Sequence, residues 1–356
     1  MTDHEPFQRE PQNPQDPQVV VFSPELLKLA DRRRQALEDC RQAAEDGDAN
    51  AVVQMGMNCL YGIGGAAKDP GKAFRWFSQT APDDPAGLYW LGVCYDNGFG
   101  VERDEDRACR LYQESAAGDY APALCNLGVC YESGQGVEKN LEKAVELYRR
   151  AAEGGYPRAW HFLGLSYDQG TGVEQNAQEA FRCFLAAAQG DYTEALCQTG
   201  MCYYFGHGAE KDYDRAAEYF RRGAEREHPR AMTRLGVCYE TGHGVEQDVQ
   251  RAEDLYRRAM ALGELEGQYC LAGLLRRRKD PESHREAARL LQKPAAVGMP
   301  RAQYLLGVCC EFGDGVEQDV SRALALYREA AGAGYPDAQC ALGVLHHPVS
   351  YTHLRA

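Results

Sequence analysis

The sequence of 356 residues lacks the long apolar runs and the excess of basic charge that several functional classes require. No apolar stretch approaches the ~18 residues of a membrane-spanning helix, so we expect no insertion into a membrane. Lys and Arg number 39 against 53 Asp and Glu, which gives a net charge of −14. This balance disfavours nucleic acid and anionic membranes as partners. The initial segment MTDHEPFQREPQNPQDPQ has neither the basic nor the apolar region of a signal peptide, so we expect a cytoplasmic location.

Motifs for catalysis and metal binding are also missing. The sequence contains no Cys-x-x-Cys and no His-Glu-x-x-His, and no serine is followed three residues later by lysine. The sequence signals for a zinc site, a zinc protease and a serine–lysine hydrolase are therefore absent. Gly-x-Gly recurs along the chain, but between helical patterns, whereas a dinucleotide site needs a preceding strand. We predict no catalytic residue, no cofactor and no bound metal.

What the sequence does contain is a repeat. A glycine in a similar local pattern recurs every 36 residues, and then returns after one divergent repeat that has Ala272 in its place. The glycines of this series are Gly56, Gly92, Gly128, Gly164, Gly200, Gly236, Gly307 and Gly343. A fixed period of this length is typical of proteins built from stacked helical repeats.

Each repeat contains two helical patterns joined by a glycine turn. In the repeat that begins at Ala123, Ala123 and Leu127 share one helix face. Gly128 follows, and because glycine weakens a helix, its recurrence predicts a crossing of two helices too close for a Cβ. Gly134 fits a helix C-cap with positive φ, and the second glycine of the turn continues it. Asn140, or Asp at the same position of other repeats, is predicted to cap the second helix.

The pattern A-x3-LG-x2-Y-x2-GxGV-x2-[DN]-x3-A-x2-LY-x2-AA-x2-G resembles the Sel-1-like repeat family, which is related to the tetratricopeptide repeats. The resemblance covers about residues 36–345. It implies an all-α fold, a right-handed α-solenoid (superhelix) of 36-residue helix-turn-helix repeats, that acts as a scaffold or adaptor in protein complexes. A cysteine-rich, secreted branch of the family implies an alternative, a β-lactam-binding hydrolase, although the motifs of such a hydrolase are absent here.

The pattern predicts four segments. Residues 1–22 are rich in Pro and Gln and are predicted to be a disordered tail. Residues 23–50 match a second helix without its first, so we expect a capping helix. Residues 51–345 form the repeat array, with eight repeats and a truncated ninth. Residues 346–356 are expected to be an irregular tail, and their string VSYTHLRA is similar to a translated sequencing adapter, which would make the tail an artefact.

One repeat, residues 267–301, departs from the pattern. It has no Gly-x-Gly turn and carries the basic cluster 276–279 instead. We interpret this cluster either as a solvated turn or as a point of docking or self-association. Pro294 lies late in the second helix, where it is expected to kink or end it.

The 14 cysteines follow the repeat as well. Equivalent residues of stacked helices are expected ~8–10 Å apart, beyond the ~7 Å Cα separation that a disulfide tolerates. We therefore predict small buried thiols in a reducing compartment. Five of them share the position two residues after the recurring glycine: Cys94, Cys130, Cys202, Cys238 and Cys309.

Candidate contacts come from the side of the first helix opposite its packed face, because the resemblance places first helices on the concave surface. The position four after the glycine is acidic in five repeats. These carboxylates either hold turn N–H groups or form an acidic ladder for a basic or amphipathic ligand. Aromatic and variable residues share that side, as interface anchors do. The candidate contacts are Tyr89, Trp90, Asp96, Glu132, His161, Phe162, Asp168, Phe205, Arg234, Glu240, Tyr304 and Glu311.

From the sequence we predict a protein–protein interaction scaffold that binds a peptide or partner protein, basic or amphipathic in character, on the concave face of the solenoid. Self-association is the third hypothesis beside the scaffold and the hydrolase, because an unfinished last repeat exposes its edge.

Overall fold

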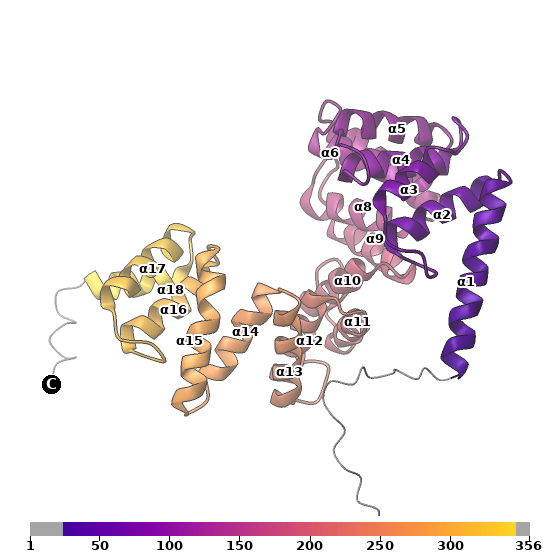
Figure 1. The fold of residues 1–356 in the computed structure, drawn as a ribbon. Coiled ribbons are helices and arrows are strands. Elements are labelled where there is room, and N and C mark those ends of the chain that lie inside the picture. Colours follow the sequence, from indigo (N-terminus) through magenta and orange to yellow (C-terminus); the bar gives the residue numbers. More distant parts are fainter. Residues whose placement is uncertain (1–23, 347–356) are drawn as a thin grey trace, which may run out of the picture. The chain divides into compact units, whose positions relative to one another are not determined.

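The computed structural model describes residues 24–346, which form eighteen helices and no strand (Figure 1). The predicted all-α solenoid of helical repeats is confirmed. The tail predicted at 1–22 lies outside the described residues, and so does the tail predicted at 346–356 apart from His346, which ends the last helix. The helices are α1 Pro24–Glu45, α2 Ala49–Tyr61, α3 Pro70–Phe77, α4 Pro85–Asn97, α5 Glu105–Ala117, α6 Ala121–Ser133, α7 Leu141–Glu153, α8 Pro157–Gln169, α9 Ala177–Gln189, α10 Thr193–Phe205, α11 Tyr213–Glu225, α12 Pro229–Thr241, α13 Val249–Ala261, α14 Leu265–Arg276, α15 Pro281–Ala296, α16 Pro300–Phe312, α17 Val320–Gly332 and α18 Pro336–His346.

Local chemistry sets the ends of these helices. The first helix of a repeat ends at a left-handed glycine, as at Gly206 with φ 73°, whose N–H donates to the carbonyl of Cys202. The second helix begins at an acid or amide, as at Asp212, whose side chain accepts from the N–H of Arg215 at 2.9 Å. The predicted N-caps are confirmed at Asp69, Asp104, Asn140, Asn176, Asp212, Asp248, Asp280 and Asp319.

The two helices of a repeat cross at the recurring glycine. A Cβ on Gly200 would lie 2.5 Å from Cε1 of Phe220, where carbon atoms in contact need about 3.5 Å. The predicted close crossing is therefore confirmed, and its partner is an aromatic ring of the second helix. The pairs are Gly56–Phe77, Gly92–Tyr112, Gly128–Tyr148, Gly164–Phe184, Gly200–Phe220, Gly236–Tyr256 and Gly307–Tyr327.

The second glycine of the turn joins consecutive repeats. Gly136 has φ 67°, and a Cβ there would lie 2.6 Å from the carbonyl oxygen of Glu105, the first residue of the preceding second helix. Gly172, Gly208 and Gly244 meet the start of the preceding second helix in the same way. The sequence indicated only a turn here, and the backbone contact between repeats is an additional role.

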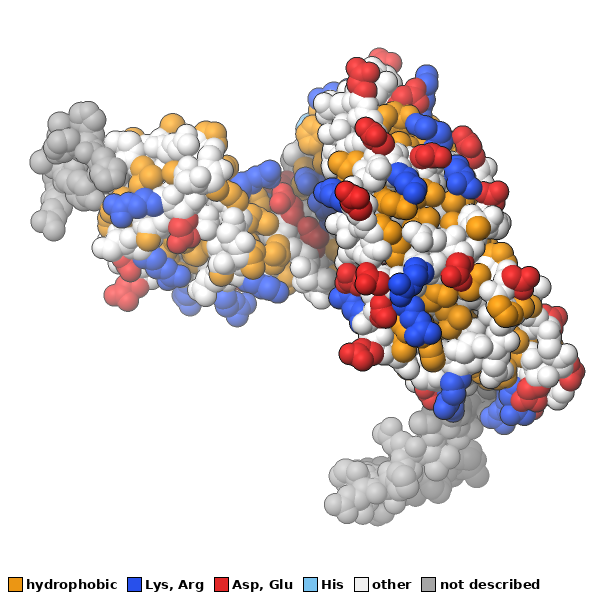
Figure 2. Space-filling model, turned by 90° about the horizontal axis from the view of Figure 1, so that it is seen from above, with side chains coloured by type: hydrophobic (Ala, Val, Ile, Leu, Met, Phe, Trp, Pro, Cys, Tyr) orange, Lys and Arg blue, Asp and Glu red, His pale blue; other side chains and the backbone are white. Residues whose placement is uncertain are grey.

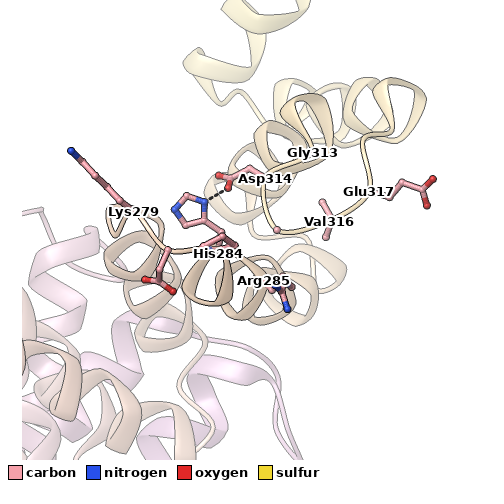
Figure 3. Close-up of a pocket in the computed structure, with 10 residues that line it drawn as sticks. Lys279, His284, Arg285, Gly313, Asp314, Val316 and Glu317 are labelled. Carbon is pink, nitrogen blue, oxygen red and sulfur yellow. Dashed lines mark ion pairs between the residues drawn. The ribbon is translucent and has the colours of Figure 1, made fainter.

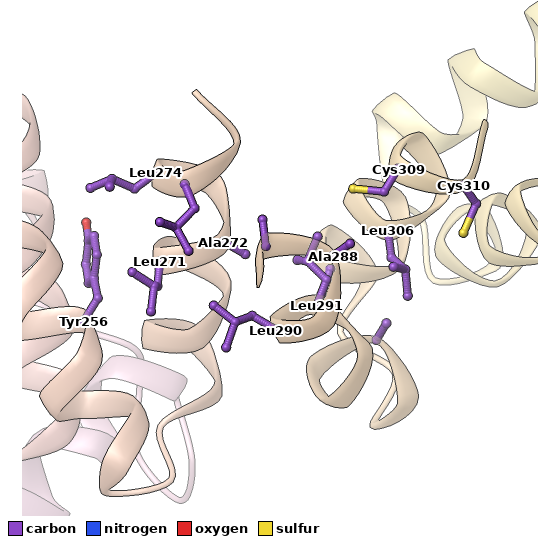
Figure 4. Close-up of a cluster of buried hydrophobic side chains, with 14 of the residues drawn as sticks. Tyr256, Leu271, Ala272, Leu274, Ala288, Leu290, Leu291, Leu306, Cys309 and Cys310 are labelled. Carbon is purple, nitrogen blue, oxygen red and sulfur yellow. The ribbon is translucent and has the colours of Figure 1, made fainter. Parts of the chain in front are cut away.

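The described residues form two compact units. The N-terminal unit comprises 24–123 with 135–137, and the C-terminal unit comprises 124–134 with 138–346. In the N-terminal unit α1 packs on α2, and Ala73, Phe77 and Cys94 lie in its core. From α7 to α18 each helix packs on its neighbours along the chain, and one buried cluster runs from α13 to α17 (Figure 4).

The five cysteines that share a position are buried, with exposed fractions of 0–8%. Burial raises the pKa of Cys94 to about 12, so its thiol is not reactive at neutral pH. No cysteine of residues 24–346 forms a disulfide.

The divergent repeat contains a proline within a helix. α15 continues through Pro294 and ends at Ala296, so the break expected at the proline falls two residues later. Proline cannot donate to the carbonyl four residues before it, and that carbonyl, of Leu290, instead accepts from Nε2 of Gln268 at 2.9 Å. A side chain of α14 thus replaces the lost helical hydrogen bond.

Ion pairs replace the missing glycine turn of this repeat. Arg276 pairs with Asp314 of the next repeat at 2.9 Å, and Arg277 and Arg278 pair with acids of the preceding repeat, Glu240 and Glu253. Glu253 is buried, and Arg257 also contacts it at 2.9 Å. Three of the four residues of the basic cluster therefore connect neighbouring repeats, which neither interpretation of the sequence included. His284 also contacts Asp314, with Nδ1 2.5 Å from Oδ1 (Figure 3).

Candidate binding groove

The recurring carboxylates have partners within the repeats. In four repeats the carboxylate accepts from the tyrosine hydroxyl of the second helix, which is the ring that lies against the recurring glycine. The pairs are Tyr112–Asp96 at 3.3 Å, Tyr148–Glu132 at 2.5 Å, Tyr256–Glu240 at 2.7 Å and Tyr327–Glu311 at 2.7 Å. Burial is the largest cause of a raised pKa of Tyr148, and the hydrogen bond to Glu132 adds to it.

Where the second helix has phenylalanine, the partner comes from the turn of the next repeat. Phe184 cannot donate, and Asp168 pairs instead with Nε2 of His207 at 2.8 Å. In the following repeat the hydroxyl of Tyr204 lies 2.9 Å from Nδ1 of His243. The acidic positions thus bind tyrosine or histidine side chains, whereas the sequence suggested turn N–H groups or a ligand.

Most of the candidate aromatics pack on neighbouring rings. Trp90 stacks on Phe77 at a centroid distance of 5.5 Å, and Phe162 stacks on Tyr148 at 5.3 Å. In both cases the ring belongs to the second helix of the preceding repeat. Tyr304 lies between Tyr327 and Tyr335, with centroid distances of 5.7 and 5.5 Å.

An open groove is found across three consecutive first helices of the C-terminal unit. α8, α10 and α12 enclose a cavity of about 360 Å³. Its lining residues are His161, Leu165, Gln169, Glu194, Cys197, Gln198, Met201, His228, Arg230 and Arg234. A second cavity, of about 480 Å³, shares Gln198 and Met201 with the first and extends past Phe205 to His207 and Asp168. We call the two together the α10 groove.

Phe205 and two arginines of the α10 groove are available for contact. Phe205 has an exposed fraction of 62%, as Phe312 does (63%) at the same position of a later repeat. Arg230 and Arg234 form no ion pair or hydrogen bond within the described residues. Figure 2 shows one face of the molecule, on which acidic and basic side chains are interspersed among hydrophobic ones.

His161 lies at the buried side of the groove. Its exposed fraction is 8%, its Nδ1 has no hydrogen-bond partner within the described residues, and burial lowers its pKa to about 4. Its imidazole is therefore neutral at pH 7. Tyr89 occupies the same position of its own repeat and is also buried.

Four of the predicted contacts meet at the α10 groove: His161, Asp168, Phe205 and Arg234. The others lie apart from its lining: Tyr89, Trp90 and Asp96 in the N-terminal unit, and Glu132, Phe162, Glu240, Tyr304 and Glu311 in the C-terminal unit. Arg230 and Met201 were missed by the sequence analysis. The spacing of Arg230 four residues before Arg234, on the same helix face, was the signal that could have found it.

Two features are absent from the described part of the chain. None of its helices is long and apolar enough to cross a membrane. Within the same residues, no three His, Cys, Asp or Glu side chains are grouped so that they could hold a metal ion.

Two solved structures resemble the chain over most of its length. One is a protective antigen of uropathogenic Escherichia coli with an SLR fold, at 27% identity and a TM-score of 0.57, covering 89% of this chain and 78% of that one. The other is a Sel1 repeat protein of Oxalobacter formigenes, at 24% identity and the same TM-score, covering 89% and 93%. The second, at this identity, supports the fold alone.

Curated relatives match over shorter stretches. The DAP3-binding cell death enhancer 1 of Rattus norvegicus is 33% identical over 96 residues, which are 26% of this chain and 18% of that protein. The HRD3B component of an ERAD-associated E3 ubiquitin-protein ligase of Arabidopsis thaliana is 32% identical over 80 residues, 22% of this chain and 12% of that protein. The chain thus spans less than a fifth of the length of either relative.

The family model of the Sel1 repeat matches seven segments: 49–81, 85–120, 121–156, 157–192, 193–228, 229–264 and 300–335. The divergent repeat falls between the last two, where the glycine turn is missing. Together the matches cover well over half of the chain, at the period that the glycines define. The chain belongs to the Sel1 repeat family.

Proposed function

We propose that this protein is an interaction scaffold that holds a partner by binding an extended peptide or a helix of it in the α10 groove. The observation that carries the proposal is the set of available side chains there. Arg230, Arg234 and Phe205 present charge and apolar area on first helices, whereas the acids and most aromatics of equivalent repeats are engaged inside the array. Exposed aromatic and arginine side chains are the usual anchors of protein interfaces.

The relatives agree with such a role. The name of the rat relative describes a protein that binds DAP3, and the plant relative is named as a component of a ubiquitin ligase. A scaffold of this kind needs no catalytic residue, and the proposed task of the repeats is to keep the groove open and rigid.

A photo-crosslinking residue can test the position of the binding surface. Benzoyl-phenylalanine would replace Gln198 in the groove, where an aromatic fits because Trp90 and Phe162 occupy the same position of their repeats. The matched control places it at Glu225, an exposed residue of α11 outside the groove. Irradiation in cells that make the protein should join a partner to the Gln198 variant alone. Equal crosslinks from both positions, or none from Gln198, would refute the proposed surface.

A further inference from the structure

We propose that the α10 groove selects acidic segments of its partner. Arg230 and Arg234 bind Asp or Glu side chains of an extended peptide, and Met201 and Phe205 contact an apolar side chain of the same peptide. This inference rests on the proposed function and names its ligand class. It differs from the basic ligand that the overall charge favours, because the carboxylates that suggested such a ligand already have tyrosine and histidine partners.

The first cavity of the groove carries one more basic than acidic side chain, in a protein of net charge −14. Its lining has two arginines and one glutamate, Glu194, and in the second cavity Asp168 is paired with His207. Arg226, the C-cap residue of the neighbouring second helix, is already paired, because it lies 2.6 Å from Asp191. Arg230 and Arg234, one helical turn apart on α12, have no such partner. Two guanidinium groups on one helix face match carboxylates, which an arginine can bind in a bidentate manner.

The uncharged polar groups of the groove suit an anion as well. Gln198 forms no hydrogen bond within the described residues that would fix its amide, and it lines both cavities. His161 lines the same groove, is almost completely buried and has a nitrogen without a partner. A neutral imidazole and an amide can donate hydrogen bonds to a carboxylate without adding a second charge to be desolvated.

The spacing on α10 sets the spacing of the ligand. Gln198, Met201 and Phe205 lie on one stripe of the helix, at i, i+3 and i+7. Seven residues of helix span about 10 Å, which an extended peptide covers with about three residues. The arginines lie beside the Gln198 end, and Phe205 lies at the other end of the helix. The preferred ligand therefore has an acidic residue about three positions from an apolar one.

Peptide selection on the full chain tests this inference. Random twelve-residue peptides displayed on phage would be selected on the immobilised protein, and the enriched peptides would be synthesised with a fluorescent label and an amidated C-terminus. We expect acidic residues about three positions from an apolar residue. The double variant Arg230→Glu/Arg234→Glu should bind these peptides at least about ten-fold more weakly. The control Arg258→Glu/Arg328→Glu changes exposed arginines of second helices by the same charge and should bind like the parent.

Failure of the inference and failure of the proposed function give different results. The variant Gln198→Trp fills the groove with a residue that another repeat accepts at Trp90. Some peptides could lose binding to Gln198→Trp but keep it with Arg230→Glu/Arg234→Glu, or prove basic. Either result would refute the acidic preference, while the groove would remain the binding site. Peptides that bind all variants equally, or the recovery of no peptide, would refute both. Circular dichroism of each variant confirms that the helices are intact.

Discussion

The crossing of the two helices at a glycine predicts that alanine, normally the better helix former, destabilises this protein. In Gly200→Ala the new methyl group would lie 2.5 Å from the ring of Phe220, so the helices must separate by about 1 Å to restore van der Waals contact. Overpacking of a tight core costs about 1–3 kcal/mol, and the gain in helix propensity offsets about 1 kcal/mol of it. We expect a net loss of up to about 2 kcal/mol in the free energy of unfolding.

The divergent repeat suggests how this loss can be rescued. There Ala272 stands in the glycine position and Leu291 in the aromatic position, and both lie in one buried cluster (Figure 4). The double variant Gly200→Ala/Phe220→Leu recreates this pair. Since the smaller side chain makes room for the methyl group, we expect the double variant to lose at least ~1 kcal/mol less than the sum of the two single losses.

Urea unfolding followed by circular dichroism measures these differences through the midpoint at a constant slope. Gly273→Ala is the matched control, because no atom lies within 4 Å of a Cβ built there. This control should gain up to about 1 kcal/mol of stability. A Gly200→Ala variant that gains as much stability as the Gly273→Ala control, or strict additivity in the double variant, would refute the close crossing as the reason for the glycine.

Three other predictions concern single residues. Tyr148→Phe removes the donor to Glu132 and should lower the free energy of unfolding by about 1–2 kcal/mol. Because the pKa of Tyr148 is raised in the folded state, the contribution of the hydroxyl to stability should be complete below pH 10 and lost as the pH rises further. Urea unfolding of parent and variant at increasing pH should therefore show a falling difference in stability, and a difference of zero at pH 7 would contradict the hydrogen bond. Glu227 has φ 57°, and glycine fills the same position of other repeats at Gly155 and Gly263. Glu227→Gly should therefore raise the melting temperature and add about 1 kcal/mol to the free energy of unfolding. A lower melting temperature would count against backbone strain at Glu227. The pKa of His161 is lowered to about 4, so the free energy of unfolding of the parent should fall by up to about 3 kcal/mol between pH 6.5 and 4, where the unfolded chain takes up the proton. His161→Tyr, which places the residue of Tyr89 and Tyr304 at this position, should lose less stability over that range. Equal acid sensitivity of parent and variant in urea titrations would disprove this account.

Local chemistry made the repeats predictable. The period, the left-handed glycine at Gly206 and the cap at Asp212 depend on residues close in sequence, and the structure confirms them. The partner of Gly200 was not predictable in identity, because Phe220 approaches it only once the helices cross. The pattern did indicate that some close neighbour existed there.

The candidate site was much less predictable. Its side chains obtain their partners from other repeats, as Asp168 does from His207 and Arg276 does from Asp314. Such pairs depend on how consecutive repeats stack, and a one-repeat helical wheel contains no information about stacking. The sequence analysis placed Arg234 on the side of the first helix opposite its packed face. It gave the same weight to Trp90, which stacks on the preceding repeat.

The central claim is that the first-helix face around α10 holds a partner segment. Hydrogen–deuterium exchange of the full chain, with and without a peptide selected on it, tests this claim most directly. The account predicts slower exchange in α8, α10 and α12 on binding, with α9, α11 and α13 unchanged. Protection confined to the second helices or to the turns, with α10 unaffected, would contradict it.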